Sequence, residues 1–215
     1  ISVSISSDGN TVAIGAIGND GNGGSIYDNK GHVRIYHYNG TVWNQLGNDI
    51  DGEAVVDESG WSVSLSNDGN TVAIGAIENT GNGNSSGHVR IYNYNGSSWN
   101  QLGNDIDGEV ANDQSGWSVS LSNDGNTVAI GAVGNDGNGS NSGHVRIYHY
   151  NGSSWNQLGN DIDGEAAADQ SGCSVSLSHD ANTVAIGAPY NDGNGSNSGH
   201  VRIYNYNGSS WNQLG

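Results

Sequence analysis

The chain repeats itself four times, and this repetition constrains its fold more than any other feature. Matching segments of the form x-Ser-Val-Ser-(Ile/Leu)-Ser begin at Ile1, Trp61, Trp117 and Cys173. The copies begin 56 to 60 residues apart. A period of this length, built from short strands, is typical of propeller blades or a similar stacked array. We expect repeats over 1–60, 61–116, 117–172 and 173–215, the last without the acidic link that ends the others, together forming one propeller-type domain.

The second copy shows what each repeat is expected to form. From Trp61 to Ser66, large apolar residues alternate with serine, and a period of two indicates a β-strand. Asn95-Gly96 between two such segments indicates a tight hairpin. Strands are expected over 61–66, 71–76, 88–94 and 97–102. With no helical periodicity in the chain, the predicted fold is all-β: a β-propeller-type array of four-stranded antiparallel blades.

Charge limits the classes of partner. Lys and Arg number 5 against 22 Asp and Glu, so the net charge is −17. Such a chain is repelled by phosphate backbones, which argues against a nucleic-acid partner. No apolar segment approaches the ~20 residues that span a bilayer, so no membrane insertion is expected. An acidic surface attracts divalent cations, which makes metal binding the chemistry to look for.

Three short motifs occur in the same order in the repeats. They are Ser-Gly-Trp-Ser-Val-Ser, Val-Ala-Ile-Gly-Ala-Pro (184–189) and Gly-His-Val-Arg-Ile-Tyr. Together they resemble the FG-GAP repeats of integrin α-chain β-propellers and their bacterial and algal relatives, over the whole chain. Trp stands where that family has its Phe-Gly aromatic, and only Pro189 completes a Gly-Ala-Pro. The family's calcium loop is shortened here to Asn67–Asn70, so calcium is not expected there.

The resemblance implies an extracellular structural or adhesive module, at the cell surface or secreted. It also implies partners that are other protein chains or further copies of the repeat, because integrin-type propellers close with more blades than four. We therefore expect a segment of a longer ring or array. No enzyme is expected, since near-identical copies do not supply the unlike residues that a catalytic site combines.

The acidic link between copies is the predicted metal site. Its carboxylates recur at relative positions 1, 3, 5 and 9, a spacing that calcium loops use to point alternate oxygens inward. The alternative is an exposed acidic strand end that protects a sheet edge from aggregation. The candidate calcium ligands are Asp49, Asp51, Glu53 and Asp57, then Asp105, Asp107, Glu109 and Asp113, then Asp161, Asp163, Glu165 and Asp169.

A histidine and an arginine recur two residues apart on the third strand of each copy, as in His88 and Arg90, followed by Tyr92. Residues two apart on a strand share one face of the sheet. A catalytic or zinc-binding role would need a cluster of such residues, and copies in different blades are too far apart to form one. We expect the Arg to pair with an acid of the neighbouring unit while the Tyr covers its aliphatic part.

Two further sets of residues suggest glycans. Sequons for N-glycosylation, which turn chemistry alone also explains in the Asn-Gly hairpins, occur at Asn39, Asn84, Asn95, Asn138, Asn151, Asn194 and Asn207. As an alternative function, a lectin would use one weak sugar site per blade and gain avidity from repetition. Its binding residues would be the tryptophans of the fourth strands, which could equally be core: Trp43, Trp99, Trp155 and Trp211.

Overall fold

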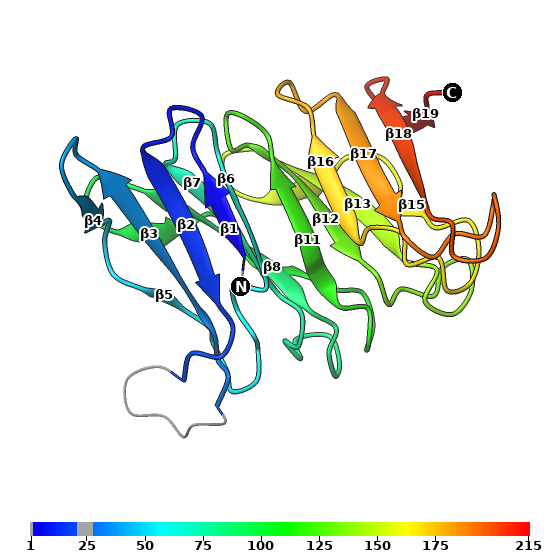
Figure 1. The fold of residues 1–215 in the computed structure, drawn as a ribbon, viewed down its shortest axis with the longest axis horizontal. Coiled ribbons are helices and arrows are strands. Elements are labelled where there is room, and N and C mark those ends of the chain that lie inside the picture. Colours follow the sequence, from blue (N-terminus) through cyan, green and yellow to red (C-terminus); the bar gives the residue numbers. More distant parts are fainter. Residues whose placement is uncertain (1, 21–27) are drawn as a thin grey trace.

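The computed structural model describes residues 2–20 and 28–215, and within these ranges every regular element is a β-strand. Ile1 and residues 21–27, which include part of the longer loop expected in the first copy, lie outside the described residues. The strands form four antiparallel sheets that follow one another in chain order, from the N-terminal sheet on the left of Figure 1 to the C-terminal sheet on the right. None of the described residues forms a helix able to cross a membrane.

The sheets correspond to the copies. The first contains β1 (Val3–Ile5), β2 (Thr11–Ala16), β3 (His32–Tyr38), β4 (Trp43–Gln45) and β5 (Ile50–Asp51). The second contains β6 (Ser62–Leu65), β7 (Thr71–Ala76), β8 (His88–Tyr94), β9 (Trp99–Gln101) and β10 (Ile106–Asp107). The third contains β11 (Ser115–Leu121), β12 (Thr127–Ala132), β13 (His144–Tyr150), β14 (Trp155–Gln157) and β15 (Ile162–Asp163). The fourth contains β16 (Ser174–Leu177), β17 (Thr183–Ala188), β18 (His200–Tyr206) and β19 (Trp211–Gln213).

Four strands of each sheet form the meander predicted from the sequence. The predicted all-β array of four-stranded blades is therefore confirmed. The Asn-Gly hairpin closes as expected, because the Oδ1 atom of Asn95 accepts the backbone N–H groups of Ser97 and Ser98 at 3.0 and 2.9 Å. Such Asx turns explain the Asn at this position without any ligand.

A fifth short strand was missed by the sequence analysis. In the first three sheets the acidic link turns back and pairs with the third strand, as Ile106 opposite Val89 and Asp107 opposite His88. The link is anchored because Ile106 is only 5% exposed and lies in the core between sheets. This pairing brings the acidic residues next to the recurring histidine of the same sheet, as Asp107 opposite His88, which the spacing within the link does not reveal.

Apolar side chains lie between successive sheets. One cluster combines Ala13, Val33, Ile35 and Ile50 of the first sheet with Val63, Leu65, Val72, Ile74 and Tyr92 of the second. Equivalent clusters join the second sheet to the third and the third to the fourth. The second and third sheets are therefore covered on both faces by their neighbours, and the first and fourth on one face, as expected for stacked blades.

The small residues of the first two strands hydrogen-bond and pack between sheets. Ser62 donates its hydroxyl to the carbonyl of Gly116 at 2.7 Å, and the backbone N–H of Leu121 donates to Ser64 Oγ at 2.9 Å. The first strands of successive sheets also contact one another, β1 with β6, β6 with β11 and β11 with β16. At Gly75 an added Cβ would collide with the Gly116 carbonyl, so glycine is required for this close approach.

Candidate metal-binding sites at the acidic links

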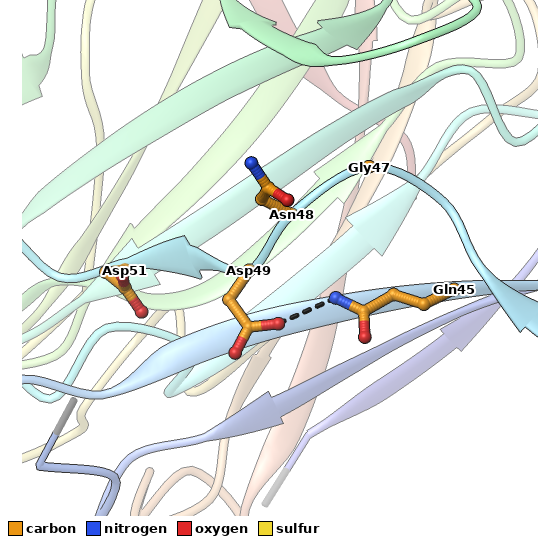
Figure 2. Close-up of a pocket in the computed structure, with 5 residues that line it drawn as sticks. All are labelled: Gln45, Gly47, Asn48, Asp49 and Asp51. Atoms are coloured by element: carbon orange, nitrogen blue, oxygen red, sulfur yellow. Dashed lines mark hydrogen bonds between the residues drawn. The ribbon is translucent and has the colours of Figure 1, made fainter. Parts of the chain in front are cut away.

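The carboxylates of one link separate toward different partners. Figure 2 shows the first of them, Asp49, beside Gln45 and Asp51 in an open cavity. Gln45 Nε2 donates to Asp49 Oδ1 at 2.6 Å, and Arg34 Nη2 donates to Oδ2 at 2.9 Å. The hydrogen bond from Arg34 holds the pKa of Asp49 below its ordinary value. In the first sheet, therefore, the Arg34 guanidinium already neutralises the charge of this carboxylate.

The last carboxylate of the link is a structural anchor. Asp57 is 2% exposed and accepts the backbone N–H groups of Glu53 and Ala54 at 3.1 and 2.8 Å. Asn79 of the next sheet donates to its other oxygen at 3.3 Å. These bonds hold the link turn against the following sheet. The equivalent acids, which are also buried, are Asp113 and Asp169.

The third carboxylate points to the next sheet. Arg90 Nη1 lies 3.5 Å from Glu53 Oε1, and its Nη2 donates to the backbone carbonyl of Asp51 at 2.8 Å. The guanidinium lies 5.6 Å from the centre of the Tyr92 ring. This is the arrangement expected from the sequence, an Arg paired with an acid of the neighbouring unit and covered by Tyr. It recurs as Arg146 with Glu109 and Arg202 with Glu165.

Consequently the four carboxylates of one link do not surround a single point. Among residues 2–20 and 28–215, the structure instead brings acids together with a histidine in three sets, in each of which the ligand atoms lie within 4.8 Å of one another. The sets are His32 with Asp49 and Asp51, Glu53 with His88 and Asp105, and Glu109 with His144 and Asp161. Metal binding at these clusters, like calcium at the links, stays a prediction. The argument against zinc at the histidines considered only histidines of different blades, whereas each cluster here combines one histidine with acids of the links.

Burial determines the charge state of these histidines. His88 and His144 are each 1% exposed. Burial lowers the pKa of His88, with a further contribution from Arg90, and lowers that of His144 to about 4. Both imidazoles are therefore neutral at pH 7. Burial, opposed by Arg90 and reinforced by the Asp105 carboxylate, raises the pKa of Glu53.

The tryptophans of the alternative lectin hypothesis lie at the junctions between sheets. Trp99, Trp155 and Trp211 are half-buried, and the indole N–H of each donates at 2.8 Å to a backbone carbonyl of the preceding sheet. Trp43 of the first sheet is 47% exposed. The first three thus contribute to sheet stacking. Sugar binding by any of the four stays a prediction.

All seven predicted glycosylation sites are exposed. Those in the hairpins (Asn39, Asn95, Asn151 and Asn207) use Oδ1 to close the turn, as described for Asn95. Of the loop sites, Asn138 donates through Nδ2 to the carbonyl of Gly164 at 2.8 Å. The positions are accessible to modification, and glycosylation stays a prediction.

Solved structures similar to this one are propeller-like proteins. The periplasmic gluconolactonase PpgL of Pseudomonas aeruginosa matches 100% of this chain with 56% of its own at 15% identity and a TM-score of 0.61. A Bacteroides uniformis protein, provisionally assigned as a 6-phosphogluconolactonase, matches 99% of this chain with 52% of its own at 10% identity and a TM-score of 0.62. Hydrazine synthase of Kuenenia stuttgartiensis matches 99% with 48% at 12% identity and a TM-score of 0.55. The chain thus spans about half the length of these structures.

These neighbours contradict the prediction that the chain is not an enzyme. Two of them are named as lactonases of the gluconolactonase type, so an array of blades of this kind can carry catalysis. The argument from near-identical copies was wrong because it treated repetition as a property that excludes activity. At 10–15% identity the likeness extends to the fold alone, and no activity is transferred from these proteins.

The family assignment comes from the sequence. No curated protein matches the chain. The family model described as FG-GAP repeat matches residues 50–92, 106–148 and 162–204, which together are more than half of the chain. Each match begins at the buried Ile of a link and ends at the Tyr that covers the Arg of the next sheet. The family unit therefore includes the junction between sheets, and the chain belongs to the FG-GAP repeat family.

Proposed function

We propose that the chain is an extracellular structural or adhesive module whose two end sheets bind further copies of the same repeat, in the same longer protein or in another. The observation that carries this proposal is a pair of exposed apolar faces. At the N-terminal sheet Val3 and Ile5 are 68% and 59% exposed, whereas the equivalent Val63 and Leu65 are each 8% exposed. The difference arises because the first sheet covers Val63 and Leu65, whereas no described sheet covers Val3 and Ile5.

The opposite end has the complementary face. In the fourth sheet Val201 and Ile203 are 66% and 42% exposed. Their equivalents in the second sheet, Val89 and Ile91, are 0% and 1% exposed because the third sheet covers them. The two end faces therefore correspond to the two sides of the interface that joins each pair of successive sheets. Exposed apolar patches of this kind mark interaction sites.

Two variants test the association, because a head-to-tail interface has unlike halves. V3D/I5D blocks the N-terminal face, and V201D/I203D blocks the C-terminal face. By sedimentation velocity we expect the wild-type chain to associate with increasing concentration and each variant alone to be monomeric. An equimolar mixture should form one-to-one dimers, since one free face of each kind remains. A wild-type chain that stays monomeric up to millimolar concentration would refute the proposal.

The extracellular location is supported by the FG-GAP family and by the exposure of every sequon. Mass spectrometry of the protein from its native source tests it: a glycan on one of the hairpin Asn residues supports the location. Calcium binding at the links is a separate expectation. Calcium would have to compete there with the partners that Asp49 and Asp57 already have within the protein. Melting temperatures with calcium and with a chelator check it, since a ligand of the folded state raises the melting temperature.

A second candidate function, glycan binding, has one observation in its favour. A groove lined by Asp49, Asp51, Tyr92 and Trp99 lies at the first junction, and the same kind of groove, with Trp211, lies at the third. Aromatic and carboxylate side chains side by side are suited to sugars. A glycan array with the wild-type chain tests this function, and no binding at millimolar sugar would remove it.

A further inference from the structure

We propose that two junctions between successive sheets each bind one divalent transition-metal ion of the zinc class. The ligands of the first are Glu53 from the link and His88 and Asp105 from the following sheet. Those of the second are the equivalent Glu109, His144 and Asp161. Both sites lie within one chain, so the proposal does not depend on the association proposed above.

The two histidines are the first observation. Each is 1% exposed, and neither ring nitrogen of either residue has a hydrogen-bond partner among the described residues. His88 Nδ1 lies 3.6 Å from Asp105 Oδ2, which is too long for a hydrogen bond. A buried polar atom without a partner destabilises a protein by about 1–3 kcal/mol. Metal coordination by Nδ1 would give that atom a partner.

The distances are close to those of a coordination sphere. Bonds of about 2.1 Å in tetrahedral geometry place ligand atoms about 3.4 Å apart. At the second junction His144 Nδ1 lies 3.9 Å from Glu109 Oε2 and 3.8 Å from Asp161 Oδ2. These two distances would have to shorten by about half an ångström, and all three ligand atoms already lie within 4.8 Å of one another. Glu109 is half-exposed and can make that movement without repacking the core.

The charges around the site leave room for a cation. The Glu109 carboxylate divides its oxygens, since Oε1 lies 3.8 Å from Arg146 Nη1 while Oε2 faces His144. Two carboxylates, one guanidinium and a neutral imidazole give a net charge of about −1, which a divalent ion reverses and a proton only cancels. Neither ring nitrogen of the buried His144 has a hydrogen-bond partner among the described residues, so a nitrogen lone pair is available to a metal ion.

The ligand types select the class of ion. Calcium and magnesium take oxygen ligands, six or more for calcium. One imidazole nitrogen with two carboxylates suits zinc and its neighbours, with the remaining positions filled by water. Such an ion would link Glu53 of one repeat to the third strand of the next. It would therefore fasten consecutive sheets together at the edge where the link crosses.

The two end sheets lack a complete site. In the first, both oxygens of Asp49 already accept hydrogen bonds from Arg34, at 2.9–3.1 Å, so a cation is already present beside His32. In the fourth, His200 Nδ1 lies 3.5 Å from Glu165, but no third ligand of the described residues joins them. For residues 1–215 the expected stoichiometry is therefore two ions.

Isothermal titration of the chelator-treated chain with zinc chloride tests the inference. We expect two zinc ions per chain with micromolar affinity, and loss of both in the variant E53Q/E109Q. The matched control is E165Q, which removes the equivalent carboxylate and its Arg pair at an incomplete site and should leave two ions bound. No saturable binding, or equal binding by E53Q/E109Q and E165Q, would overturn the proposal.

A spectroscopic measurement identifies the nitrogen ligand. Cobalt(II) is the probe, and the wild-type chain should show visible absorption of a low-coordinate site that H88N/H144N lacks. Circular dichroism confirms that this variant is folded; if it is not, the glutamate variants above decide. Zinc should also raise the melting temperature of the wild type and of E165Q but not of E53Q/E109Q. Displacement of zinc by a tenfold excess of calcium would refute a site that includes a histidine.

Discussion

The contribution of sheet stacking to stability can be measured at one position that recurs in every copy. Ile147 on β13 is 1% exposed because the fourth sheet covers it, whereas the equivalent Ile203 on β18 is 42% exposed. The same substitution, Ile→Ala, removes the same atoms at both positions. The difference between the two variants therefore reports what the following sheet contributes.

The magnitude follows from the buried surface. At about 0.8 kcal/mol for each buried carbon, loss of three carbons at Ile147 reduces stability by about 2.4 kcal/mol. The cavity that remains between the sheets adds about 1 kcal/mol, for a total of about 3–4 kcal/mol. At Ile203 roughly three-fifths of the side chain is buried, so the transfer contribution falls to about 1.4 kcal/mol, and no closed cavity forms.

Urea denaturation followed by tryptophan fluorescence measures both variants. The expected result is a loss of unfolding free energy for I147A that exceeds the loss for I203A by about 2 kcal/mol. Since repeat arrays can unfold in stages, hydrogen exchange of the β18 amides shows whether the last sheet opens separately. Equal losses at the two positions, with the last sheet unfolding together with the rest, would refute the reasoning that stacking buries these faces.

Three further predictions use the same comparison between copies. G75A should destabilise the chain by several kcal/mol because its Cβ meets a backbone carbonyl of the next sheet, whereas G187A, which meets only a serine hydroxyl, should cost far less in thermal melts. W155F should cost about 1 kcal/mol through its lost hydrogen bond, and W43F almost nothing; equal effects in urea titrations would contradict this. The pKa of His144 is lowered from 6.5 to about 4 in the folded state, so between these pH values the unfolded chain binds a proton there and the folded chain does not. The free energy of unfolding should therefore fall as the pH is lowered from 6.5 toward 4, and H144N should flatten that part of the stability–pH curve.

The fold could be predicted because its signals are local. A period of two, as at Val63 and Leu65, and the hairpin at Asn95 each lie within a few residues of one another. The fifth strand was missed because two residues, such as Ile106 and Asp107, are too short to show a period. Its pairing depends on the third strand of the same sheet, which lies well before it in the chain.

The grouping of the acids could not be predicted from their spacing. Carboxylates two residues apart in one link were expected to share one ion, but Glu53 extends to the next sheet while Asp57 turns into its own loop. What each acid meets is decided by the neighbouring repeat, whose position is a consequence of stacking. His88 becomes a candidate metal ligand only once the fold places its side chain 3.6 Å from Asp105, which the sequence alone does not show.

Strand β18 of the fourth sheet shows why the proposed association through the ends would be directional. On β18 the side chains alternate between two faces, and Tyr204, on the face toward the third sheet, is 8% exposed. Val201 and Ile203, on the opposite face, are 66% and 42% exposed. The face that matches them carries Val3 and belongs to the other end of the array. Two C-terminal faces placed together would bury apolar side chains without the serine bonds that join unlike faces, so a head-to-tail contact is favoured over a symmetric one.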